Sequence, residues 1–130
     1  MPITDDLYLY FEFPPKNIEF FTDDQQRNNL IYSNSQGKVR RRIYTFAGYT
    51  ELMLYAVPEG SKHTNIEKAT ASSDGTLYAM FCAENSLVYI GDLRKQVSLK
   101  TVLDYSKKGV VRSIRWRPGT TELIVSGGSG

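Results

Sequence analysis

The sequence has 130 residues, of which 23% are charged, and a formal net charge of +2. This is the length of a single domain with a real core, and the composition excludes both a disordered chain and a polybasic one. The only cysteine, Cys82, excludes an internal disulfide framework and a cysteine-based zinc site. No run approaches the ~18 apolar residues of a membrane span, and acidic residues stand where a secretory signal would be basic. We therefore expect a protein of the cytoplasm or nucleus.

Short runs rich in β-branched and aromatic residues follow one another along the chain, and helical periodicity is almost absent. The first run, residues 7–13, alternates strictly and ends at Pro14 and Pro15, because proline cannot donate to a ladder. The later predicted strands are 18–21, 30–33, 38–46, 51–57, 67–71, 76–82, 87–90, 99–103, 111–116 and 122–125. This series predicts an all-β sandwich, barrel or propeller.

An internal repeat separates these architectures. The string LIYSNSQG at residues 30–37 returns as LIVSGGSG at residues 123–130, about two periods later. Within one period, the aligned pairs are Ala69 with Ile114, Ala71 with Trp116, Ile18 with Ile66, and Leu30 with Leu77. A four-stranded propeller blade repeats every ~40–45 residues, which is close to these spacings.

The segment from Lys62 to Leu93 carries a family resemblance. His63 stands near a usual Gly-His position, Ser72–Gly75 matches a Ser-Pro-Asp-Gly turn through Asp74 and Gly75, and Asp92 ends the third strand. In these features the segment resembles a WD40 repeat, and residues 110–128 resemble the first two strands of a following repeat. The chain departs from the pattern in having no Trp-Asp dipeptide and a lysine before His63.

The repeat and the resemblance together predict antiparallel four-stranded blades of a partial WD40-like β-propeller, about two and a half in number. The predicted division is an N-terminal strand at 1–17, blades at 18–60 and 61–108, half a blade at 109–127, and a linker at 128–130. A small closed β-barrel or sandwich is the alternative. A propeller ring needs about 4–8 blades, and the half blade has an open edge. We therefore expect the rest of the propeller, or a self-associated copy, as a partner, with residues 7–13 as an outer or latching strand.

Candidate catalytic residues are few. His63 is the only histidine, so a three-ligand zinc site is not expected, and its WD40-like position implies a buried hydrogen bond that braces the blade. Cys82 lies in a predicted core strand, where an unreactive packing role is expected. Residues 72–75 and 127–130 are predicted turns and not phosphate loops, because no helix follows them. We expect no metal and no cofactor.

Two basic groups are candidate contact residues. Alternating side chains of a strand point to opposite faces, so Lys38, Arg40, Arg41 and Arg42 place positive charge on both faces of one strand. This pattern predicts an exposed outer strand that either protects an edge or binds phosphate or an acidic partner. Arg112, Arg115 and Arg117 flank Trp116. We expect Trp116 to pack between blades and the arginines to contact a partner.

WD40-like propellers are predominantly platforms on which other molecules assemble, so the resemblance implies a non-catalytic protein–protein interaction scaffold in a multi-subunit complex. The alternative is binding of RNA or anionic lipid through residues 38–42, which salt would weaken strongly. An enzyme with its site in a central channel is a third hypothesis. It would require several acids or histidines on inner strands, and the sequence offers almost none there.

Overall fold

The computed structural model describes residues 11, 14–82, 84, 86–95 and 99–128. They form ten strands: β1 (Pro15–Thr22), β2 (Asn28–Asn34), β3 (Lys38–Thr45), β4 (Gly48–Ala56), β5 (Ile66–Ala71), β6 (Leu77–Cys82), β7 (Leu87–Asp92), β8 (Leu99–Asp104), β9 (Val110–Trp116) and β10 (Leu123–Gly128). Each predicted strand from residue 18 onward overlaps one of them. The predicted strand at 7–13 lies, apart from Phe11, outside the described residues.

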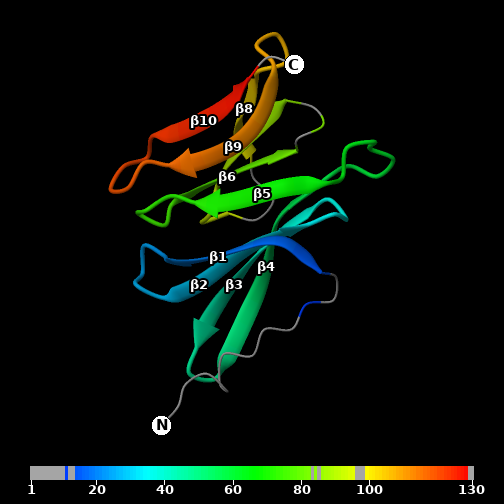
Figure 1. Cartoon of the computed structure of the whole chain (residues 1–130). Helices are drawn as coiled ribbons and strands as arrows, with labels where there is room; N and C mark the ends of the chain where they lie inside the picture. Colours follow the sequence, from blue (N-terminus) through cyan, green and yellow to red (C-terminus); the bar gives the residue numbers. More distant parts are fainter. Residues whose placement is uncertain (1–10, 12–13, 83, 85, 96–98, 129–130) are drawn as a thin grey trace.

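The strands form three antiparallel sheets (Figure 1). Sheet β1-β2-β3-β4 is called blade 1, sheet β5-β6-β7-β8 is called blade 2, and β9 pairs with β10 in a third sheet. Within each sheet, strands that are neighbours in sequence pair with each other, and no pairing among the described residues closes the sheets into a barrel. The all-β class with four-stranded propeller-like blades is thus confirmed, and the closed-barrel alternative is wrong. Within the described part of the chain, no helix is long and apolar enough to span a membrane.

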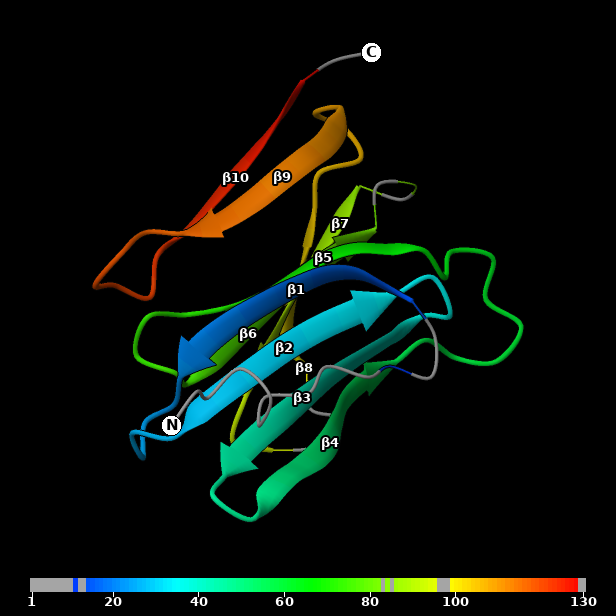
Figure 2. The same cartoon turned by 60° about the horizontal axis from the view of Figure 1, so that its bottom comes forward.

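Blade 2 lies between blade 1 and the β9–β10 sheet, and the first strands β1, β5 and β9 follow one another across the stack (Figure 2). Two hydrophobic clusters join the layers. The first contains Ile31, Val39, Leu54, Ile66, Ala69, Ala71, Tyr78, Met80, Cys82 and Leu93. The second contains Ala79, Phe81, Val88, Val111, Ile114 and Trp116. Trp116 therefore packs between layers as predicted, and its Nε1–H donates to the carbonyl of Thr70 at 3.0 Å.

Strand β6 shows why the middle layer reads as a continuous apolar run, LYAMFC. Successive side chains of a strand point to opposite faces. Tyr78 and Met80 belong to the cluster shared with blade 1, whereas Ala79 and Phe81 belong to the cluster shared with the β9–β10 sheet. Both faces of β6 are covered, so neither face selects polar residues.

The structure corrects two alignments of the repeat. The sequence repeat pairs Leu30 with Leu77, but Leu77 packs against the second cluster, while the neighbour of Leu30, Ile31, belongs to the first. Leu30 therefore faces away from blade 2, and its counterpart is Tyr78, which faces blade 1. The offset becomes 48 (78 − 30). The pair of Ile18 and Ile66 is wrong as well: Ile18 pairs with Tyr32 as Ala69 pairs with Met80, so Ile18 corresponds to Ala69. A slip of one residue exchanges the two faces of a strand, so this correction decides which residues are equivalent.

The turns after the first strands stack at one end of the layers. Gly75 has φ +73°, and a Cβ atom there would lie within 3 Å of the backbone of Asp23, so the turn needs glycine for both reasons. The amide of Gly119 donates to Ser73 Oγ at 2.9 Å. Asp74 Oδ1 accepts from Ser72 Oγ and from Thr76 Oγ1, at 2.7 Å each. Asp74 and Gly75 therefore have the turn role that the WD40 resemblance implied.

Candidate binding surfaces and the buried arginine network

Strand β3 carries the basic run, and its placement contradicts the predicted exposed outer strand. β3 is the third strand of blade 1 and pairs with both β2 and β4. Arg41 and Arg42 are only 4% and 3% exposed, and Lys38 and Arg40 are half-buried. A buried guanidinium requires partners for its charge and its donors, and the sheet supplies them on both faces.

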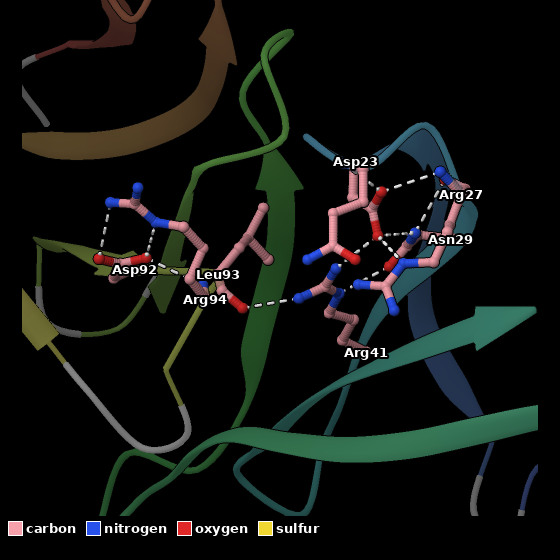
Figure 3. A network of polar contacts seen from close by, with 8 residues as sticks. Asp23, Arg27, Asn29, Arg41, Asp92, Leu93 and Arg94 are labelled. Atoms are coloured by element: carbon pink, nitrogen blue, oxygen red, sulfur yellow. Dashed lines mark hydrogen bonds and ion pairs between the residues drawn. The ribbon is translucent and has the colours of Figure 1, made fainter.

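Arg41 is the centre of the polar network shown in Figure 3. Its Nη2 lies 2.9 Å from Asp23 Oδ2, its Nε donates to Asn29 Oδ1 at 2.6 Å, and its Nη1 donates to the carbonyl of Leu93 at 2.7 Å. The first two partners belong to blade 1, whereas Leu93 follows β7 of blade 2. The network therefore joins the two blades through one buried side chain.

Asp23 lies in the turn between β1 and β2, and its side chain is fully shielded from solvent. Burial alone would raise its pKa. The backbone amide of Arg27, the side-chain amide of Asn29 and the amide of Gln25 all donate to the carboxylate, and together with Arg27 they hold the pKa at about 2 instead of 3.8. Asp23 is therefore charged throughout the neutral range, as Arg41 requires.

The depressed pKa of Asp23 predicts a loss of stability in acid. A carboxyl group whose pKa is lower in the folded than in the unfolded chain stabilises the fold above the unfolded value, and this contribution disappears as the pH falls through the folded value. The shift from 3.8 to about 2 corresponds to about 2 kcal/mol, lost between about pH 4 and pH 2. Urea unfolding measured across this range should show the decline. An Asp23→Asn variant should be less stable at pH 7 and should show a shallower decline, and an unchanged slope would contradict this assignment.

Arg42 and Arg40 point to the other face of blade 1, which is turned away from blade 2. Glu51 Oε2 accepts from Arg42 Nε at 2.7 Å, and Glu51 Oε1 accepts from Tyr32 Oη at 2.8 Å and lies 3.4 Å from Arg40 Nη1. Burial would raise the pKa of Glu51, but the hydrogen bonds from Arg42 and Tyr32 outweigh it and lower the pKa. The Arg42 guanidinium also lies over the rings of Phe11 and Tyr49, at 4.4 and 4.5 Å. On this face, Arg42 is thus paired with Glu51 and covered by aromatic rings.

The second basic group lies on the surface, as its predicted contact role requires. Arg112, Arg115 and Arg117 are all exposed, while Trp116 between them is buried. Arg117 pairs with Glu122 at 2.8 Å, and both side chains are largely exposed, so this pair contributes little to stability. A role of these arginines in partner binding stays a prediction.

Sequence reasoning missed the exposed apolar residues at the two ends of the stack. Ile18 and Phe20 of β1 are 38% and 54% exposed, and Ile124 of β10 is 52% exposed. The repeated string gave a usable signal for one of them. Ile124 occupies the place of Ile31 in that string, and Ile31 is fully buried against blade 2.

The remaining candidate residues from the sequence are His63, Cys82 and Asp92. The His63 side chain is exposed, so the predicted buried hydrogen bond is wrong. The loop that leads into β5 places this side chain outside the core. Cys82 is buried, and burial raises the pKa of its thiol to about 11, in agreement with the predicted packing role. Asp92 accepts from the amide and the guanidinium of Arg94, which lowers its pKa to about 2. In the described part of the chain, no three His, Cys, Asp or Glu side chains are placed to hold a metal.

Comparisons with known proteins agree with the architecture. No protein-family profile matches the sequence, and no curated protein matches it. Among solved structures, the chain is similar to Hsv2 of Kluyvelomyces marxianus, a WD40 β-propeller protein, with a TM-score of 0.51 and 14% sequence identity. The similarity covers 90% of this chain and 33% of the Hsv2 chain, so the chain spans about a third of that protein's length. At this identity the likeness shows the fold alone: the chain has the architecture of consecutive blades of a β-propeller.

Proposed function

We propose that the chain is a non-catalytic, WD40-like propeller segment that acts as a protein–protein interaction scaffold in a multi-subunit complex. The observation that carries this proposal is the exposure of Ile18, Phe20 and Ile124 on the two end faces of the stack. In the two internal junctions, residues on the corresponding faces are buried in hydrophobic clusters. Exposed apolar residues grouped on a sheet face are typical of protein interaction sites.

The chemistry of the β9–β10 face defines the kind of partner. Arg115 is the cross-strand neighbour of Ile124, so a guanidinium and an apolar side chain lie together on the exposed face. Arginine beside apolar surface is a common anchor combination at interfaces. The face thus fits a protein surface that offers apolar side chains and carbonyl or carboxylate acceptors. The single buried thiol of Cys82 is compatible with the cytoplasm or nucleus as the compartment.

Binding of RNA or anionic lipid through Lys38, Arg40, Arg41 and Arg42 stays a prediction that the geometry does not favour. Arg41 and Arg42 already pair with Asp23 and Glu51 inside blade 1. Phosphate binding would require them to leave these carboxylates, and a buried carboxylate left without its partner costs several kcal/mol.

Quantitative affinity purification from cell extract, with chemical cross-linking, tests the scaffold proposal. We expect a specific set of proteins bound to the wild type to fall at least about tenfold with Ile124→Glu or Arg115→Glu. The matched control is Val102→Glu, because Val102 is also about half exposed but lies on the outer strand β8. Equal recovery of the bound proteins with the wild type and all variants would contradict the proposal. Bound proteins that high salt or nuclease alone removes from the wild type would also contradict it, because such binding runs through nucleic acid or charge.

A further inference from the structure

We propose that the two end faces of the stack bind each other in separate molecules, so that blade 1 of a second copy packs on the β9–β10 sheet. This inference rests on the proposed scaffold function and names the partner of its two faces. The contact would repeat the way in which blade 2 packs on blade 1.

The β9–β10 face has the residues that form the junction between blades 1 and 2. In the string LIYS of β2, Ile31 is fully buried against blade 2, and Ser33 Oγ donates to the carbonyl of Ile66 at 3.2 Å. In the string LIVS of β10, the same places hold Ile124 and Ser126, and both are exposed. The β9–β10 sheet therefore presents the isoleucine and the serine hydroxyl of an inter-blade junction with no blade against them among the described residues.

The opposite end face supplies the other half of such a junction. Ala69 and Ala71 of β5 are buried where blade 2 meets blade 1. Ala71 pairs with Tyr78 as Phe20 pairs with Leu30, so the counterparts of these two alanines in β1 are Ile18 and Phe20. Ile18 is 38% exposed, and Phe20, two residues along the same face of β1, is 54% exposed. Phe11 contacts Tyr32 at 4.7 Å between ring centroids and Arg42 at 4.4 Å, so it covers the part of this face over β2 and β3. On β1, the side chains of Ile18 and Phe20 remain exposed.

The exposed residues of the two end faces lie on strands equivalent to those that form the internal junctions between the sheets. Blade 1 meets blade 2 mainly through β1 and β2 against β5, and blade 2 meets the third sheet through β5 and β6 against β9. A contact of β1 in one copy with β9 and β10 in the next would therefore use the same layer of the fold. It would cover Ile18, Phe20 and Ile124, and removing their exposed apolar surface from water favours the contact.

The two end faces differ, so the contact is heterologous and repeats until a ring closes. The described residues of each copy form two four-stranded sheets and one two-stranded sheet. A propeller ring has about 4–8 blades, which corresponds to two or three copies of this chain. The assembly expected in solution is therefore a small closed oligomer and not a filament.

A mixing experiment tests this inference, because each end face can be disabled separately. Phe20→Glu blocks the blade 1 face and leaves the β9–β10 face intact, and Ile124→Glu does the reverse. We expect the wild type to form a dimer or trimer by light scattering and analytical ultracentrifugation, and each variant alone to be monomeric. An equimolar mixture of the two variants retains one functional pair of faces and should form a 1:1 dimer and nothing larger.

Matched controls separate the effect of the end faces from that of a new charge. Phe46→Glu changes the almost fully exposed Phe46 of the β3–β4 turn, and Val102→Glu changes an exposed residue of β8. Both should assemble like the wild type, and circular dichroism should show that all four variants are folded. A wild type that stays monomeric at millimolar concentration, variants that assemble normally, or a mixture that stays monomeric would each overturn the inference. A monomeric wild type whose other bound proteins are still lost with Ile124→Glu would leave the scaffold proposal standing.

Discussion

Replacing Arg41 with methionine should lower the free energy of unfolding by about 3–5 kcal/mol, because one partner of a buried ion pair is removed. The Asp23 side chain is fully shielded from solvent and lies 2.9 Å from the guanidinium. Without Arg41, Asn29 Oδ1 and the carbonyl of Leu93 also lose their donor. Methionine fills similar volume, so the loss is electrostatic and not a cavity effect. Urea unfolding followed by circular dichroism measures it.

Arg27→Met is the matched control, because Arg27 binds the same carboxylate from a partly exposed position. Its Nε lies 2.9 Å from Asp23 Oδ2, and its side chain is 39% exposed. An exposed pair of this kind contributes about 0–1 kcal/mol. If the two substitutions cost the same, Arg41 is not the buried link between the blades.

Replacing Trp116 with alanine should lower the free energy of unfolding by about 3–5 kcal/mol, the usual cost of removing a large aromatic ring from a core. Trp116 is 7% exposed and packs in the cluster that joins blade 2 to the β9–β10 sheet. Its indole N–H also donates to the carbonyl of Thr70, which would lose this donor. Because Trp116 is the only tryptophan, the unfolding of the variant is followed by circular dichroism.

Ile124→Ala provides the comparison on the same sheet. Ile124 is about half exposed, so its truncation in the monomer should change the stability by no more than about 0.5 kcal/mol. A Trp116→Ala variant as stable as Ile124→Ala would mean that the third sheet does not pack on blade 2 through this residue.

The strands were predictable because each is a short alternating or apolar run closed by turn residues, and these are local signals. The position of a strand within its sheet is not local. Lys38–Arg42 reads as an exposed edge because it is charged on both faces, yet β3 is paired on both sides. The carboxylates that pair with Arg41 and Arg42 lie 18 residues before Arg41, at Asp23, and nine residues after Arg42, at Glu51.

The end faces were only partly predictable. The repeat of LIYS and LIVS marks Ile124 as an equivalent of Ile31, but exposure depends on whether another layer covers the face. The repeat alone pairs Leu77 with Leu30, which is wrong, because a strand repeat tolerates a slip of one residue unless the buried face is known. His63 was expected inside on resemblance alone, and the loop before β5 leaves it exposed.

Residue-resolved hydrogen exchange of the purified chain tests the central claim most directly, namely that the described residues form three sheets stacked as consecutive blades, with β10 paired to β9 on one edge. The account predicts protection of both alternating sets of amides in β2 and β6, because each has a paired neighbour on both sides. In β10, only the amides that face β9 should be protected, since its other edge is unpaired among the described residues. Uniform protection along β10, or rapid exchange throughout β6, would contradict this arrangement.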